Sequence, residues 1–329
     1  MGSVKTWFLG TTMGSAMYAR FVVPHYHSFV RINGGSEQKV ELPDCELDGE
    51  FVADPFLFAW GGDIWLFFEG MRKGRGNRGV AKGVIGCLRK DGQGWRYMGV
   101  ALEEPYHLSY PQIFEDGGSV YMIPETAQAG EVALYEAVDF PLKWRRAAVL
   151  MHGRYVDSSL LRRDDFYYIV ATPEAIRSRA ELWRARALAG PWERHPSSDN
   201  VSSSLSLRRN GGAIYEDGGY AYRIAQDCDG GYGMRLFRVP IEVITPTSYS
   251  EGAAELLSEA ISWPQPKMHH TYNRIKVGES IYEVVDRHYN TIRKPVSFLV
   301  AAVWYLIDGL RYVFRSIFSG HTSRQGVMG

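Results

Sequence analysis

A sixteen-residue pattern recurs five times in this chain and constrains its fold more than any other feature of the sequence. Two copies, Asp54 to Glu69 (DPFLFAWGGDIWLFFE) and Tyr110 to Glu125 (YPQIFEDGGSVYMIPE), align without a gap. Both have glycine at positions eight and nine, an aromatic residue at position twelve and glutamate at position sixteen. The other copies begin at Asp157, Gly211 and Thr271. By subtraction, successive copies start 56, 47, 54 and 60 residues apart, a spacing typical of the strand repeats in β-propellers.

Each copy has the residue pattern of a β-hairpin. A short apolar run leads into a turn rich in Gly or Asp, and a second run is rich in aromatic and β-branched residues. Further strand pairs are expected at 79–88 with 95–101 and at 132–137 with 144–150. The pattern therefore predicts an all-β fold, a five-bladed β-propeller over residues 1–290. The alternative is a β-sandwich, which a shared repeat frame disfavours.

The segments outside the repeats predict three further elements. Residues 6–11 are predicted to form a strand, and the segment before the first copy, residues 1–45, is expected to supply a strand that joins the last blade and closes the ring. Residues 250–260 have a helix-like composition. Residues 291–329 form a tail in which 296–318 is predicted to be an amphipathic helix. Its apolar run is too short to span a hydrocarbon core of about 30 Å. We expect it to lie at a membrane surface, to pack on the propeller or to form a dimer contact.

The composition disfavours nucleic-acid binding and favours a reducing compartment of the cell. Lys+Arg and Asp+Glu both number 37, so no net positive charge favours a nucleic-acid partner. Three cysteines, without metal-ligand spacing, indicate a reducing environment rather than a disulfide framework. The first residues lack the apolar core of a secretion signal. We expect a cytoplasmic protein that contacts the inner face of the membrane peripherally, if its tail binds there.

The first position of the frame predicts a functional pocket. In a propeller the innermost strands line a central channel, so these first residues should gather at one mouth. Asp54 and Asp157 both occupy this position, and Asp54 has apolar neighbours in sequence. A buried carboxylate needs a partner or a ligand, and its pKa shifts. Both are therefore candidate catalytic residues; the alternative is that each caps its own turn.

Several long motifs resemble a known family. VADPFLF, SYPQIFEDGGSVYMIPET, VDSSLL and GPWERHP are similar to the N-terminal domain of plant glucosamine inositolphosphorylceramide transferases and their bacterial relatives, over roughly residues 5–285. More distantly, the chain resembles the five-bladed furanosidases (arabinanases, xylosidases and invertases). That resemblance implies that Asp54 acts as base or nucleophile and that Asp157 orients it. It also implies a glutamate as general acid near the fourth copy, where this sequence has Arg208 and Arg209 instead.

The missing acid leaves the remaining roles open. Glu125 is the best substitute as general acid and Glu69 the next, because glycoside hydrolysis needs two carboxyl groups; both are alternatively structural. Arg209 and Arg223 are suited to a phosphate group or to salt bridges. The other candidates for substrate binding are Tyr110, Gln226, Asp227, His269 and His270. Neighbouring strand residues face opposite sides, so at most one of the two histidines faces the channel.

We expect a carbohydrate-active, glycosyltransferase-like enzyme of surface-glycan or glycolipid assembly that uses a phosphate-bearing sugar donor. In the plant relatives this domain lies beside a separate transferase domain, so the propeller need not be the catalyst. The alternatives are an intracellular glycoside hydrolase or phosphorylase and a non-catalytic glycan-binding propeller. No residue cluster predicts a bound metal, and a divalent cation in the central channel is left open.

Overall fold

The computed structural model describes residues 22–73, 82–92, 94–175, 179–202, 207–228, 233–263 and 269–292. The chain divides into two units: Tyr26–His288, and the two chain ends Met1–His25 with Tyr289–Gly329. The predicted strand at 6–11 and the predicted helix at 296–318 lie outside the described residues. Among the described helices, none has the length and apolar character needed to cross a bilayer.

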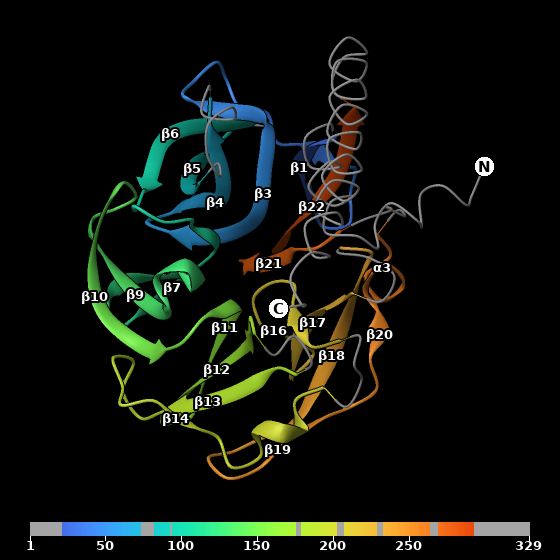
Figure 1. Cartoon of the computed structure of the whole chain (residues 1–329). Helices are drawn as coiled ribbons and strands as arrows, with labels where there is room; N and C mark the ends of the chain where they lie inside the picture. The colour runs from blue at the N-terminus through green and yellow to red at the C-terminus, as the bar shows by residue number, and fades with distance from the viewer. Residues whose placement is uncertain are drawn as a thin grey trace, which may run out of the picture. The chain divides into compact units, whose positions relative to one another are not determined.

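The described chain is mostly β-structure, arranged as successive antiparallel blades (Figure 1). Blade 1 contains β3 (Leu47–Trp60), β4 (Asp63–Arg72), β5 (Gly83–Asp91) and β6 (Gly94–Leu102). Blade 2 contains β7 (Ser109–Asp116), β8 (Ser119–Glu125), β9 (Glu131–Asp139) and β10 (Lys143–His152). Blade 3 contains β11 (Tyr155–Arg163), β12 (Phe166–Pro173), β13 (Glu181–Ala185) and β14 (Glu193–Arg194). The four strands of blades 1 and 2 confirm the strand pairs expected from the sequence.

Blades 4 and 5 are less regular. Blade 4 contains β15 (Arg209–Asn210), β16 (Tyr215–Asp217), β17 (Tyr220–Asp227), β18 (Arg235–Ile244), β19 (Tyr249–Glu251) and β20 (Glu255–Leu256). Blade 5 contains β21 (Tyr272–Val277), β22 (Ser280–Ile292), β1 (Val22–Ile32) and β2 (Gln38–Lys39). The helix predicted over 250–260 was wrong except for one turn, α3 (Leu257–Ala260). The residues before that turn pair with β18 instead, because an unpaired sheet edge was available to them.

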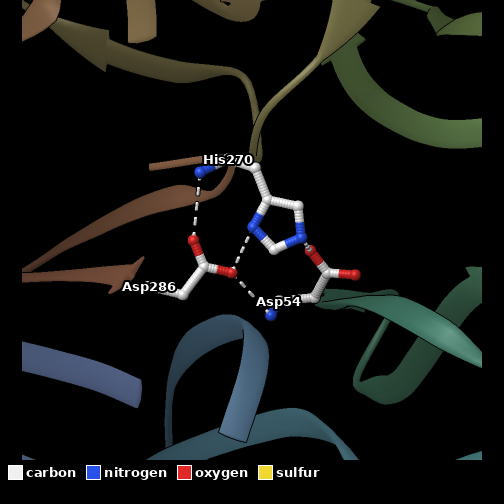
Figure 2. Close-up of side chains that lie close together, drawn as sticks. All are labelled: Asp54, His270 and Asp286. Carbon is white, nitrogen blue, oxygen red and sulfur yellow. Dashed lines mark hydrogen bonds and ion pairs between the residues drawn. The ribbon is translucent and has the colours of Figure 1, made fainter. Parts of the chain in front are cut away.

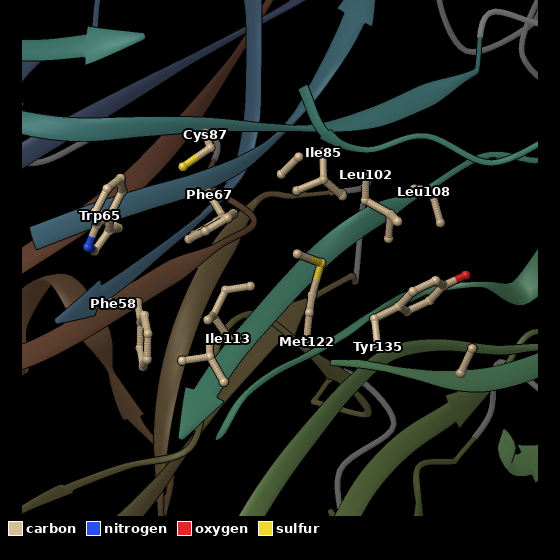
Figure 3. Close-up of a cluster of buried hydrophobic side chains, with 13 residues drawn as sticks. Phe58, Trp65, Phe67, Ile85, Cys87, Leu102, Leu108, Ile113, Met122 and Tyr135 are labelled. Atoms are coloured by element: carbon tan, nitrogen blue, oxygen red, sulfur yellow. The ribbon is translucent and has the colours of Figure 1, made fainter. Parts of the chain in front are cut away.

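Hydrophobic clusters join each blade to the next. Between blades 1 and 2, Phe67 and Ile85 pack against Met122 and Tyr135 (Figure 3). Among the described residues, similar clusters join blades 2 and 3, blades 3 and 4, blades 4 and 5, and blades 5 and 1. Each fully buried large apolar side chain contributes about 1.5–3 kcal/mol. The five clusters therefore hold the blades in a closed ring.

The ring closes through a strand near the N-terminus. β1 lies next to β22 in the sheet order and also pairs in parallel with β3 of blade 1, where Tyr26 is opposite Phe51. Arg31 on β1 forms a buried ion pair with Glu283 on β22, at 2.7 Å between Nε and Oε2. A strand from the N-terminal region was predicted to close the ring; in the structure this strand is residues 22–32.

Candidate functional site

A β-bulge at the first frame position shapes the mouth of the propeller. Asp54, Tyr110 and Asp157 have φ values of 45°, 48° and 50°, in the left-handed region that non-glycine residues rarely adopt. The strand register shifts at all three places. Proline follows two of these residues, and the broken ladder tolerates it. Bulges re-aim side chains, so the same strained feature turns three side chains inward.

The last frame position lies beside the first. In blade 1 the residue before Asp54 pairs with Glu69, and in blade 2 the residue before Tyr110 pairs with Glu125. Both ends of each hairpin therefore meet at the same mouth. The last-position residues are Glu69, Glu125, Thr172, Gln226 and Asp286. All five carboxyl groups of the candidate site and the amide of Gln226 come from these two frame positions, whereas the cations His270 and Arg209 lie just before position one of their copies.

Asp54, His270 and Asp286 form the centre of the site (Figure 2). His270 Nδ1 lies 2.6 Å from Asp286 Oδ2, and His270 Nε2 lies 3.4 Å from Asp54 Oδ1. Asp286 also accepts hydrogen bonds from the backbone N–H groups of Asp54 (3.0 Å) and Thr271 (2.9 Å). The Thr271 hydroxyl donates to Asp54 Oδ1 at 2.5 Å. The histidine thus joins a carboxylate of blade 1 to one of blade 5.

The charges of this cluster shift the pKa of each member. Burial alone would lower the pKa of His270, but the negative charges of Asp286 and Asp54 raise it to about 9. Burial would raise the pKa of Asp286, yet its attraction to His270 leaves that pKa below the ordinary value. The pKa of Asp54 is raised, mainly by burial and despite His270. His270 is therefore a cation at neutral pH.

The same three residues form a candidate cation site. Each offers one ligand atom, and these atoms lie within 4.8 Å of one another. A carboxylate and imidazole set suits transition metals and zinc. A protonated imidazole cannot ligate, so metal binding here requires His270 to lose its proton. At neutral pH the imidazolium itself neutralises the carboxylates.

Two adjacent histidines are expected to titrate in opposite ways. The His269 Nδ1–H donates to the backbone oxygen of Asp286 at 2.9 Å, and burial lowers the pKa of His269 to about 4. In NMR titrations of ring-labelled protein, we expect His270 to titrate near pH 9 and His269 to stay neutral above about pH 5. Because the pKa of His270 is higher in the folded state than in the unfolded chain, its charged form adds to the free energy of unfolding. This contribution is complete below about pH 6.5 and is lost as the pH rises through 9. Titration of both rings near pH 6.5 would contradict this assignment.

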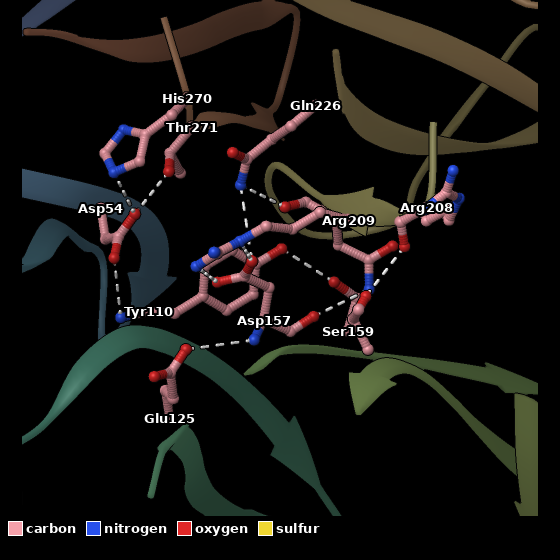
Figure 4. Close-up of polar contacts among 12 residues, drawn as sticks. Asp54, Tyr110, Glu125, Asp157, Ser159, Arg208, Arg209, Gln226, His270 and Thr271 are labelled. Atoms are coloured by element: carbon pink, nitrogen blue, oxygen red, sulfur yellow. Dashed lines mark hydrogen bonds and ion pairs between the residues drawn. The ribbon is translucent and has the colours of Figure 1, made fainter. Parts of the chain in front are cut away.

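Asp157 lies on the other side of the mouth, held by an arginine (Figure 4). Arg209 Nε donates to Asp157 Oδ2, and Arg209 Nη2 donates to Oδ1 at 3.3 Å. The backbone N–H of Asp157 donates to Glu125 Oε2, also at 3.3 Å. Burial and the charge of Asp157 raise the pKa of Glu125 to about 8, against the effect of Arg209. Glu125 therefore holds a proton at neutral pH.

Gln226 lies beside Asp157 and has an unused acceptor. Its Nε2 donates to the backbone oxygen of Asn210 at 2.6 Å and lies 3.5 Å from Asp157 Oδ2. Both of these are acceptors, which fixes the orientation of the amide. Its buried Oε1 then has no hydrogen-bond partner among the described residues. Such a group points to a ligand or to an ordered water at this position.

Glu69 is a second carboxyl group near the mouth with a raised pKa. Burial, followed by the charges of Asp54 and Glu125, raises its pKa well above the ordinary value. His107 Nε2 lies 3.3 Å from Glu69 Oε1, and the backbone N–H of Gly83 donates to His107 Nδ1 at 2.9 Å. Burial lowers the pKa of His107. The neutral ring therefore presents its Nε2–H to Glu69.

Tyr110 is buried at the centre of the ring and bonds to neighbouring blades. Its hydroxyl donates to the backbone oxygen of Gly212 at 2.7 Å, accepts from Gly212 N–H at 2.6 Å and lies 2.9 Å from Ser159 Oγ. The side chain is 1% exposed. It links blade 2 to blades 3 and 4 beneath the carboxylates.

The remaining predicted residues lie away from the carboxylate cluster or are already paired. Arg223 is 0% exposed and forms a two-pronged ion pair with Glu251 at 2.6 and 3.0 Å. Asp227 is paired with Arg235 at 2.5 Å. His269 lines a separate cavity of about 60 Å³ between blades 4 and 5. Of the two adjacent histidines, only His270 faces the mouth, as expected from the alternation of side chains along a strand.

Two important residues were missed by the sequence reasoning. Asp286 occupies position sixteen of the fifth copy, as Glu69 and Glu125 do in theirs, so the frame itself contained the signal. Tyr26 lies on β1, outside the repeats, and its ring is 5.0 Å from the ring of His270. No repeat pattern points to it, because β1 reaches the site only when the ring closes.

Comparison with known proteins places the chain in a family. The model of the N-terminal region of glucosamine inositolphosphorylceramide transferase 1 matches residues 40–281. The rice (japonica) transferase is 36% identical over 233 residues, covering 67% of this chain and 31% of that protein. The Arabidopsis thaliana transferase is 32% identical over 249 residues, covering 71% and 32%. The chain thus spans about a third of the length of these relatives.

Solved structures show the same fold at low identity. A family 117 glycoside hydrolase from Zobellia galactanivorans is 13% identical and has a TM-score of 0.53, over 79% of this chain and 90% of that chain. An α-L-arabinofuranosidase from Clostridium thermocellum is 9% identical and has a TM-score of 0.51, over 71% and 81%. Both support the propeller fold alone. By its sequence match, the chain belongs to the family of the glucosamine inositolphosphorylceramide transferase N-terminal domain.

Proposed function

We propose that this chain is a carbohydrate-active domain of glycolipid or surface-glycan assembly, and that its mouth binds and acts on a sugar unit. One observation carries the proposal: five carboxyl groups from four blades gather around two cations and the unpartnered amide oxygen of Gln226. The carboxyl groups are those of Asp54, Glu69, Glu125, Asp157 and Asp286, and the cations are Arg209 and His270. Family membership supports a role in glycosyl transfer.

The protonation states suit general acid–base chemistry. Glu125, whose pKa is about 8, can donate a proton to the oxygen of a leaving group. Asp54 has a raised pKa and can take a proton from an acceptor hydroxyl, while Thr271 and the backbone N–H of Tyr110 hold its two oxygens. Arg209 orients Asp157. These roles retain the pair of aspartates expected from the sequence.

The charge of the site favours an amino sugar. The relatives' name includes glucosamine, whose amine is a cation when protonated. Even with Glu69 and Glu125 protonated, the three remaining carboxyl groups outnumber the two cations, so a cationic sugar complements the field better than an anion does. For a phosphate-bearing donor, the candidate contact is Arg209, which is 26% exposed, because Arg223 is fully buried against Glu251.

A glycoside hydrolase or phosphorylase is the second candidate. The observation that favours it is the coexistence of a proton-bearing Glu125 with a second carboxyl group, Asp54, in one mouth. Two carboxyl groups with separated protonation states are what glycoside hydrolysis requires. Transfer and hydrolysis then differ in whether a sugar hydroxyl or water accepts the glycosyl group.

Asp54→Asn is expected to lower turnover by at least about a hundredfold, because it removes the proposed base. The protein would be assayed with nucleotide-sugars, aryl glycosides, and glycosides with inorganic phosphate, followed by product chromatography. Asp63→Asn is the matched control, since Asp63 is the first residue of β4, beside the turn of the same hairpin, and is 43% exposed. It should retain full activity.

The pattern of products separates the candidates. Nucleotide release that Asp54→Asn abolishes supports transfer, and activity on glycosides alone supports hydrolysis or phosphorolysis. Binding of sugars without any turnover supports a non-catalytic glycan-binding propeller. Absence of sugar binding in calorimetry would reject the proposal.

We also propose cytoplasmic location with peripheral contact at the inner face of the membrane. The support is the amphipathic sequence of 296–318, with aromatic residues near basic ones. Co-sedimentation of the full chain with anionic vesicles is the direct test, and lack of binding would overturn it.

A further inference from the structure

Tyr26 is fixed at the edge of the candidate site by its ring alone. Its ring packs edge-on to Phe51 at 5.0 Å, lies 5.0 Å from the ring of His270 and stacks on His288 at 4.8 Å. On the backbone, Tyr26 is opposite Phe51 in the parallel pairing of β1 with β3. These contacts use only the aromatic ring, and each aromatic pair contributes about 0.5–1.5 kcal/mol beyond its buried area.

The hydroxyl of Tyr26 is not used by this packing. It forms no hydrogen bond with the described residues, and the side chain is only partly buried. Burial, followed by the charges of Asp286, Glu69 and Asp54, raises the pKa of this hydroxyl well above its ordinary value. The group therefore keeps its proton and can act as a donor within the field of these three carboxyl groups.

We propose that the Tyr26 hydroxyl is a specificity-determining group that donates a hydrogen bond to a neutral oxygen of the sugar bound at the mouth. This inference rests on the proposed function. The ring packing of Tyr26 does not use the hydroxyl, and a partly exposed hydroxyl without a protein partner is available to bond to a ligand in place of water. The nearby acids disfavour a phosphate at this position, so a sugar hydroxyl or ring oxygen is the acceptor.

The test is Tyr26→Phe, which keeps the ring contacts and removes only the donor. Binding would be measured by calorimetry with methyl 2-amino-2-deoxyglucoside and with its monodeoxy analogues. We expect affinity to fall about fivefold to thirtyfold, the effect of one hydrogen bond, with an unchanged melting temperature. Tyr97→Phe is the matched control, because its hydroxyl donates to Glu46 at 2.9 Å and should not affect sugar binding.

The monodeoxy analogues identify the acceptor. One analogue should bind the wild type and Tyr26→Phe equally well, because it lacks the oxygen that the hydroxyl contacts. Equal affinity of wild type and Tyr26→Phe for the parent sugar would overturn this inference and leave the proposed function standing. A wild-type protein that binds no sugar would overturn both.

Discussion

Replacing Gly212 by alanine is expected to cost more than about 4 kcal/mol and to prevent folding of most of the protein. A Cβ at this position would lie 1.7 Å from the backbone oxygen of Tyr272, and the φ of 146° is one that other residues rarely adopt. The backbone cannot shift to relieve the clash, because Tyr110 bonds both the N–H and the oxygen of Gly212. Soluble yield and urea unfolding measure the effect.

Gly49→Ala is the control for this substitution. A Cβ at Gly49 would meet nothing within 4 Å, and its φ is not positive. We expect its unfolding free energy to stay within about 1 kcal/mol of the wild type. If the free energy of unfolding of Gly212→Ala equals that of the wild type, the backbones of Gly212 and Tyr272 are not in close contact and this prediction is wrong.

Replacing Arg223 by methionine is expected to destabilise the protein by about 3–5 kcal/mol at pH 7, because it leaves Glu251 buried without its partner. Arg223 also donates to the backbone oxygen of Leu207 at 3.2 Å, which adds to the loss. Chemical denaturation would measure it. A variant with normal stability but weaker sugar binding would instead support the sequence-based prediction that Arg223 contacts substrate.

The pH dependence of this variant gives an independent check. In the wild type, burial raises the pKa of Glu251, but the attraction of Arg223 outweighs it and lowers that pKa. Wild-type Glu251 thus contributes stability above its unfolded pKa, and this contribution is lost at acid pH. Without Arg223 the pKa of Glu251 should rise, so Glu251 becomes protonated as the pH is lowered from 7 to 4.5. The loss in free energy of unfolding of the variant relative to the wild type should therefore shrink over that range. The double substitution Arg223→Met with Glu251→Leu should recover most of the loss.

Much of the site was predictable because equivalent positions of the sequence repeat occupy equivalent places in the propeller. Residues at one frame position occupy equivalent places in successive blades, so Asp54 and Asp157 were correctly expected to approach the same mouth. Position sixteen carries the same information for Glu69, Glu125 and Asp286, since it pairs beside position one in each hairpin.

Pairing between charged residues was not predictable in the same way. Arg209 and Arg223 both lie in blade 4, on β15 and β17, yet Arg209 binds Asp157 at the mouth and Arg223 pairs with Glu251. A strand's alternation predicts which face a side chain takes. It does not say which opposite charge lies within reach, because that depends on how neighbouring blades pack.

By itself, the sequence determined the hairpin repeat, the family and the two aspartates of the mouth, because local patterns of turns and alternating residues encode them. Only the tertiary structure decided the identity of the central cluster. His270 and Asp286 meet Asp54, and Tyr26 meets His270, across the junction where the last blade joins the first. Those contacts depend on closing the ring, which brings together residues that no local pattern relates.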